Sequence, residues 1–144
     1  MINLIDRITS GVLVHFHSVS LLLIRVLLAY GFYEPAMNKW NDIDSVAGWF
    51  ESLGIPFPLL NTYMAATTEL LGVGLLALGL FTRYISLPLI VTMVVAIGTV
   101  HFQNGFSAGD NGYEIPLYYL AMLLVLVGNG AGRFSIDNLI FKKA

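Results

Sequence analysis

Residues 19–37 read VSLLLIRVLLAYGFYEPAM, and this stretch carries only two charged residues, Arg25 and Glu34. About 20 mostly apolar residues, each rising ~1.5 Å along a helix, cross the ~30 Å hydrocarbon core of a bilayer. The stretch therefore predicts a membrane-spanning helix. A charge in hydrocarbon costs roughly 2.5–3.5 kcal/mol on insertion scales, so the buried charges need a reason.

Three further apolar runs follow at residues 59–81, 84–102 and 113–130. The chain of 144 residues is 57% hydrophobic and only 11% charged, with a mean hydropathy of +0.78. This composition is typical of integral membrane proteins rather than soluble domains. We predict an all-α fold in one membrane domain, residues 1–144: a membrane-spanning four-helix bundle.

The segment before the first span has its own apolar period. Ile2, Ile5, Ile8 and Val12 recur at helical spacing. One basic residue and no small-residue cleavage site precede the span, so a cleavable signal is not expected. This spacing predicts a short N-terminal amphipathic helix that lies on the membrane surface.

Residues 40–58, between the first two spans, also predict a short helix. Asp44 and Ser45 are good N-cap residues, and Gly54 with the following prolines marks an end. The apolar face of this helix would present Val46, Trp49, Phe50 and Leu53. We expect the helix to lie across the outer mouth of the bundle.

Basic residues are unevenly distributed between the two sides of four alternating spans. One side carries Lys39 alone, and the other carries Arg7, Arg83, Arg133, Lys142 and Lys143. Cytoplasmic loops carry the excess of Lys and Arg. We predict a multi-pass protein of a bacterial or archaeal plasma membrane, with the N and C termini in the cytoplasm.

Several function classes are excluded by composition. The chain has no cysteine, which rules out disulfides, thiolate metal sites and iron–sulfur ligation by this chain. A net charge of −2 without a basic stripe argues against a nucleic-acid partner. No flavin, nicotinamide or haem motif is present. His15 and His17 lack a third ligand, so no metal site is predicted.

The ionisable residues of the spans are expected to meet in a shared interior. Helical rise places Glu69 near mid-membrane and Arg25 at a similar depth, which predicts a deep Arg25–Glu69 pair. An outer ring would lie above it, formed by Glu34, Lys39, His101 and Glu114. Small residues surround Glu69 on its helical face, as expected where membrane helices approach closely.

Each of these residues also has a purely structural interpretation. The Arg25–Glu69 pair could fix helix register, and Asn111-x-x-Glu114 resembles a capping box. His101 could be an interfacial histidine, Lys39 a snorkelling anchor, and Glu34 a solvated residue at the end of a helix.

With these residues in this order, the chain resembles the DoxX family of small four-span membrane proteins, which is related to a membrane subunit of thiosulfate:quinone oxidoreductase. The resemblance covers roughly residues 25–137, and its ordered segments are Arg25 with Lys39, ELLG from Glu69, LGLFTR to Arg83, His101, GYE to Glu114 and GNGAGRFSID to Asp137. The chain departs from the family at Ala29 and Ala36, where glycine is common.

The resemblance implies membrane redox work linked to a quinone, either as an oxidoreductase or as a subunit of one. In that hypothesis Glu69, His101 and Glu114 exchange protons as catalytic residues. Arg25, Lys39 and Glu34 bind the substrate, with the two cations stabilising a developing oxyanion. Shifted pKa values suit a carboxylate and a histidine to this role in a low-dielectric site.

Two alternatives remain open. The chain could be a non-catalytic assembly subunit that stabilises another enzyme, with a protein partner or a second copy docked on it. It could also form a proton or small-solute pathway, since intramembrane carboxylates and histidines are the usual parts of one.

Overall fold

The computed structural model describes the backbone of residues 2–141 and the side chains of residues 13–141. The described chain is entirely helical, which confirms the predicted all-α class. The longer helices are α1 (Ile2–Asn41), α2 (Ile43–Ser52), α3 (Pro58–Leu78), α4 (Thr82–Ala96) and α5 (Glu114–Asn129). The short elements are the π-helical turn η1 (Ile97–His101), the 3-10 turns η2 (Phe102–Asn104) and η3 (Ala108–Asp110), and α6 (Ile136–Ile140).

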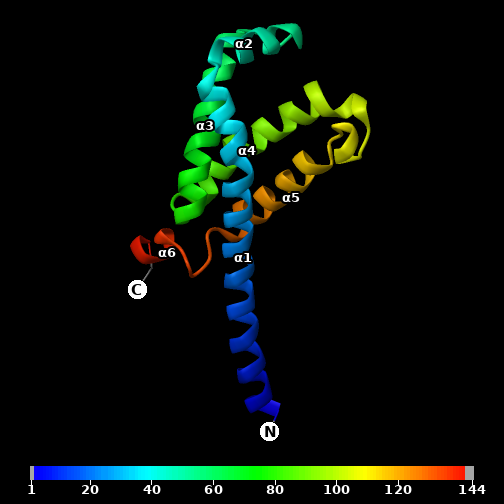
Figure 1. Ribbon diagram of the computed structural model, residues 1–144. Coiled ribbons are helices and arrows are strands. Elements are labelled where there is room, and N and C mark those ends of the chain that lie inside the picture. Colours follow the sequence, from blue (N-terminus) through cyan, green and yellow to red (C-terminus); the bar gives the residue numbers. More distant parts are fainter. Residues whose placement is uncertain (1, 142–144) are drawn as a thin grey trace.

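Helices α1, α3, α4 and α5 run alternately up and down (Figure 1). Helix α1 packs most extensively on α3, and α4 packs on α5, while α3 joins the two pairs by contacting α4. The end that carries α2 and η3 is called the α2 end here. The opposite end carries α6 and is called the α6 end, and α1 projects beyond it (Figure 1).

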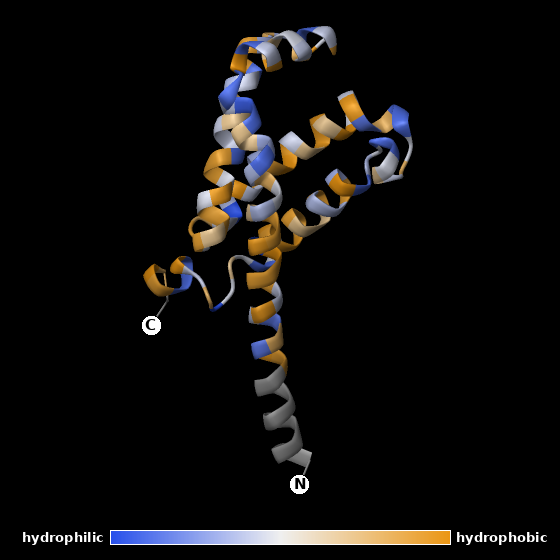
Figure 2. Cartoon of the chain, viewed as in Figure 1, coloured by the Kyte–Doolittle hydropathy of each residue, from blue (hydrophilic) through white to orange (hydrophobic). Residues whose placement is uncertain are grey.

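The core lies where the two helix pairs meet. Leu28, Phe32, Leu76, Leu89 and Leu123 are fully buried there. Apolar residues dominate the long helices, and hydrophilic ones gather at the α4–α5 turn and toward the α2 end (Figure 2). Towards that end the α4–α5 pair diverges from the α1–α3 pair (Figure 1).

Within the described part of the chain, two helices are long and apolar enough to cross a membrane by length and composition, Leu13–Asn41 and Thr82–Asn104. Helix α5 is apolar but shorter. Helix α3 carries polar residues up to its middle, among them Asn61, Thr68 and Glu69, which lower its hydropathy. The prediction of four spans therefore stays a prediction.

The prediction of a separate N-terminal surface helix is wrong. Residues 2–41 form one continuous helix, and the proline within it, Pro35, lies far beyond the join of the two parts. The apolar side chains that suggested the separate helix, Ile2 to Val12, lie outside the part of the chain whose side chains are described.

The predicted short helix between the first two spans is confirmed as α2, with one correction. Its N-cap is Asp42 rather than Asp44, because an Asp42 carboxylate oxygen accepts a hydrogen bond from the Ser45 amide at 3.1 Å. Trp49 remains exposed, and Ala47 is the buried residue of the helix.

Acid should loosen α2. Hydrogen bonds from the Ser45 hydroxyl and amide lower the pKa of Asp42 below its ordinary value. A lowered pKa contributes stability above the unfolded-state pKa, and that stability is lost as the pH falls through the folded-state pKa. We expect the fluorescence of Trp49 to report loosening below about pH 4. Asp42→Asn keeps the cap and should flatten this profile, and an unchanged profile would contradict the assignment.

Candidate functional site

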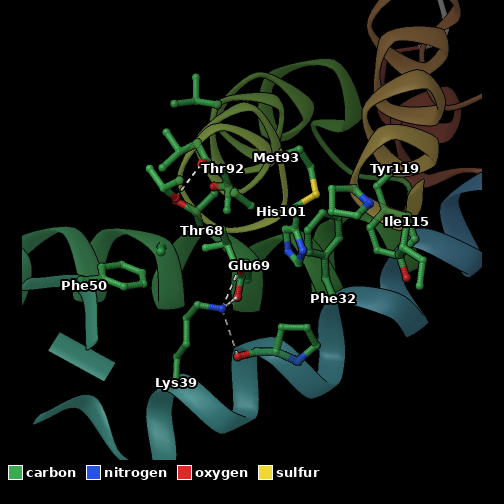
Figure 3. Close-up of a pocket in the computed structure, with 18 of the residues that line it drawn as sticks. Phe32, Lys39, Phe50, Thr68, Glu69, Thr92, Met93, His101, Ile115 and Tyr119 are labelled. Carbon is green, nitrogen blue, oxygen red and sulfur yellow. Dashed lines mark hydrogen bonds and ion pairs between the residues drawn. The ribbon is translucent and has the colours of Figure 1, made fainter. Parts of the chain in front are cut away.

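The site is a cavity of about 610 Å³ at the α2 end, between the α1–α3 pair and the α4–α5 pair. Most of its wall is apolar, contributed by residues such as Phe32, Met64, Val91 and Ile115. The ionisable groups on its wall are Lys39, Glu69, His101 and Tyr119. Figure 3 shows these side chains around one space.

Lys39 and Glu69 form an ion pair in this cavity. The Lys39 Nζ lies 2.8 Å from Glu69 Oε2 and 3.1 Å from Oε1, and it also contacts the Pro35 carbonyl at 3.5 Å. Glu69 is 3% exposed and Lys39 is 17% exposed. The carboxylate is therefore enclosed, whereas the ammonium still reaches the open part of the site.

The predicted Arg25–Glu69 pair is wrong, and side-chain direction is the reason. Helical side chains lean toward the N-terminus of their own helix. Helices α1 and α3 are antiparallel, so Arg25 leans toward the α6 end and Glu69 leans toward the α2 end. Lys39, further along α1, leans back toward Glu69 and takes its place as the partner.

Arg25 instead joins three backbone carbonyls at the α6 end. Its guanidinium donates to Leu76 O at 3.0 Å, to Ala77 O at 3.5 Å and to Phe134 O. The last carbonyls of a helix lack intrahelical donors and carry partial negative charge. Arg25 is fully buried and does not line the cavity. Its hydrogen bonds instead hold α1 to the end of α3 and to the C-terminal segment, and this set of contacts is called the Arg25 clasp.

Asp137 completes this clasp from the C-terminal segment. Its carboxylate accepts hydrogen bonds from Phe81 N at 2.7 Å and Thr82 N at 3.0 Å, which caps α4. Gly79 has φ +66°, and a Cβ there would lie 2.3 Å from the Arg25 guanidinium. The α3–α4 turn and the C-terminal segment are thus joined at the α6 end by the hydrogen bonds of Asp137 and Arg25.

His101 is presented to the cavity by a π-helical turn. The Phe102 amide bonds to Ile97 O, one residue wider than in an α-helix. Such turns are frequent at functional sites. The His101 Nδ1 lies 2.8 Å from the Asn111 carbonyl oxygen, which can only accept, so Nδ1 carries a proton. In the neutral ring, Nε2 is therefore a hydrogen-bond acceptor.

Glu114 does not line the cavity. One oxygen accepts from Ala108 N at 2.9 Å and the other from the Tyr118 hydroxyl at 3.1 Å. Helix α5 begins at Glu114 with Tyr113 as its N-cap, so the predicted Asn111 capping box does not form. Glu114 instead holds the loop that brings the Asn111 carbonyl to His101.

Glu34 is exposed on α1 and is also absent from the cavity wall. Of the six predicted site residues, the structure therefore gathers Lys39, Glu69 and His101. It places Arg25, Glu34 and Glu114 elsewhere.

Tyr119 is a wall residue that the sequence interpretation missed. Its ring packs edge-on against Phe32 with centroids 5.4 Å apart. A Cβ on Gly31 would lie 1.8 Å from the Tyr119 hydroxyl, so only glycine leaves room for it. The signal was a glycine inside an apolar span, which marks close approach in membrane helices.

Gly31→Ala should therefore displace Tyr119 and destabilise the protein by about 1–3 kcal/mol, as overpacking typically does. Gly74→Ala is the matched control, because a Cβ there meets nothing within 4 Å and alanine favours helix. Thermal unfolding in detergent measures both variants. Equal stability of the two would contradict the close packing of Tyr119 on Gly31.

Comparisons with known proteins find that the chain is similar to a family of membrane proteins. The sequence model described as DoxX matches residues 20–102. An uncharacterised protein of Haemophilus influenzae is 38% identical over 132 residues, covering 86% of this chain and 85% of that protein. No solved structure matches.

Two more distant relatives carry informative names. An uncharacterised membrane protein of Mycobacterium tuberculosis is 30% identical, covering 87% of this chain and 83% of that protein. A Bacillus subtilis protein named "Putative oxidoreductase CatD" is 29% identical, covering 86% of this chain and 89% of that protein.

Proposed function

Since the chain belongs to the DoxX family of membrane proteins, we propose that it is a membrane-embedded redox subunit that binds a quinone in the cavity at the α2 end. The observation that carries this proposal is an enclosed Lys39–Glu69 pair that shares one largely apolar cavity with His101. The name of the Bacillus subtilis relative supports a redox role.

The proposal includes four membrane crossings by α1, α3, α4 and α5, with the cavity opening to the outer side. The alternating order of the helices supports an even number of crossings. Most basic residues fall toward the α6 end, which supports placing that end and both termini in the cytoplasm.

The cavity fits a ring with a long apolar tail. Ligand pockets typically measure about 300–1,000 Å³ and combine an apolar wall with a few polar groups that orient the ligand. The polar groups here meet that description: an ammonium donor on Lys39, a carboxylate on Glu69 and an acceptor on His101. The apolar wall excludes water and strengthens the interactions of these groups.

A quinone supplies two-electron redox chemistry coupled to two protons, with a partner protein as the electron donor or acceptor. The residues of this chain hold and move the protons. His101 Nε2 would accept a hydrogen bond from one ring hydroxyl and then its proton, while Nδ1–H keeps its hydrogen bond to the Asn111 carbonyl. The proton of the second hydroxyl would leave to water through the open part of the cavity. The Lys39 ammonium stabilises negative charge on a ring oxygen, and Glu69 keeps that ammonium in place.

The test compares binding of a short-chain quinone and its quinol to the purified protein, followed by quenching of Trp49, which lines the cavity. His101→Asn retains a donor for the Asn111 carbonyl but has no basic ring nitrogen. One neutral hydrogen bond contributes about 1 kcal/mol, so quinol affinity should fall about fivefold while quinone affinity is kept. Equal losses for both forms, or no binding by the wild type, would overturn the proposal.

A second candidate function is assembly of another membrane enzyme without chemistry of its own. It is favoured by the stretch of α1 beyond the other helices, where Leu13 and Phe16 are 62% and 66% exposed. A stable partner that co-purifies with both the wild type and His101→Asn, without any quinone response, would select this function.

A proton or solute pathway is less well supported. Below Glu69 the core is closed by fully buried apolar side chains, Leu28, Leu76, Leu89 and Leu123. The buried polar side chains of Arg25 and Ser86 in this half donate to backbone carbonyls, and neither has a hydrogen bond to Glu69 among the described residues.

A further inference from the structure

We propose that a second cavity, at the α6 end, binds the phosphodiester headgroup of an anionic phospholipid. This cavity measures about 520 Å³ and lies between the start of α4 and the C-terminal segment. Its wall includes Arg83, Phe81, Tyr84, Gly130 and Phe141. The site is separate from the cavity at the α2 end and requires no redox chemistry, but it rests on the proposed orientation with the α6 end in the cytoplasm.

Arg83 supplies a positive charge that no salt bridge pairs among the described residues. Its guanidinium donates one hydrogen bond, from Nη2 to the Gly128 carbonyl at 3.2 Å. Among the side chains of residues 13–141, the single salt bridge is Lys39–Glu69, so no carboxylate pairs with Arg83. The remaining N–H groups can hold two phosphate oxygens, which is the geometry that a guanidinium favours.

The acidic residue on the wall of this cavity, Asp137, already accepts hydrogen bonds from the backbone. Both oxygens of Asp137 accept from the backbone amides of Phe81 and Thr82. Both oxygens are therefore occupied at the start of α4, and neither forms a salt bridge with Arg83. The Arg83 guanidinium can therefore attract an anion.

Aromatic rings form the other wall, as at a membrane interface. The Phe81 ring lies 6.3 Å from the Tyr84 ring and 5.9 Å from the Phe141 ring, centroid to centroid. Phe81 adopts φ +49°, an unfavourable backbone conformation for a bulky residue, and this conformation is held by Asp137. Aromatic belts sit at headgroup depth.

The residues around this cavity are apolar and basic, which suits contact with the acyl chains and the anionic headgroups of a lipid leaflet. Leu139 is 77% and Phe141 58% exposed beside the cavity, and Lys142 and Lys143 follow directly in the sequence. Anionic lipids are concentrated in the cytoplasmic leaflet, and basic pockets between helices on that side bind their headgroups. The same phosphate chemistry also occurs in free inorganic phosphate, so the test separates the two sources.

The experiment counts lipids retained by the full-length protein in native mass spectrometry, with dioleoylphosphatidylglycerol titrated against dioleoylphosphatidylcholine. We expect one saturable phosphatidylglycerol per chain. Arg83→Gln should weaken it about fivefold, since one basic residue near a surface contributes roughly that factor. Arg133→Gln is the matched control, because Arg133 is exposed and outside the cavity, and it should bind like the wild type.

Arg83→Lys keeps the charge and tests the site if the Gln variant does not fold; its affinity should fall between the two. Competition by millimolar inorganic phosphate should leave the lipid bound. Equal weakening by Arg83→Gln and Arg133→Gln would reduce the effect to overall charge and overturn the proposal. Displacement by inorganic phosphate would overturn the assignment to a lipid.

Discussion

Arg25→Ala is expected to destabilise the protein by about 3–5 kcal/mol, because hydrogen bonds to a charged group contribute about 1.5–3 kcal/mol each and buried carbonyls lose their donor. The substitution leaves the carbonyls of Leu76, Ala77 and Phe134 without their shared donor in a buried place. Because these carbonyls belong to α3 and to the C-terminal segment, the α6 end should open. Thermal or denaturant unfolding in detergent measures the loss.

Two controls define what this result means. Arg133→Ala removes an exposed arginine from the same end and should change stability by less than about 0.5 kcal/mol. Arg25→Lys retains the charge without the planar fork and should give an intermediate loss. If Arg25→Ala were as stable as Arg133→Ala but failed to bind quinone, the clasp would be rejected and the substrate-binding role restored.

The second large effect concerns the Lys39–Glu69 pair, and it should be asymmetric. Lys39→Met leaves the carboxylate of Glu69, which is 3% exposed, without a partner, and should cost about 3–5 kcal/mol. Glu69→Leu leaves an ammonium that can swing toward the open part of the cavity, so its cost should be smaller. The double variant Lys39→Met/Glu69→Leu should recover most of the lost stability, because an apolar pair of similar volume replaces the ions.

A double-mutant cycle, read by the free energy of unfolding, measures the coupling between these two residues. Additive single effects would show that the two charges do not interact. A double variant as unstable as Lys39→Met would show that the pair is needed for the fold itself.

Local patterns in the sequence were enough to predict the helices. Apolar runs and turn residues located α3, α4, α5 and α2, and Glu69 was correctly expected to point inward. The join between residues 2–12 and the rest of α1 was missed, because apolar spacing alone does not distinguish a surface helix from the extension of a longer one.

The partners of the charges could not be predicted from depth alone. Arg25 bonds to Leu76, seven residues after Glu69, which is about 10 Å further along the helix. Side chains on antiparallel helices lean in opposite directions, so Arg25 and Glu69 point away from each other and Lys39 points toward Glu69. For His101, the π-turn positions the side chain and the Asn111 carbonyl decides which ring nitrogen carries the proton, and neither leaves a pattern in the sequence.

The most direct test of the central claim is equilibrium binding of a short-chain quinone to the purified protein, compared with the folded double variant Lys39→Met/Glu69→Leu. If the cavity with its ion pair is a quinone site, the wild type binds saturably and the double variant binds at least tenfold more weakly while remaining folded. If the two proteins bind equally, or if neither binds, the Lys39–Glu69 pair is a packing feature and the cavity is not the quinone site.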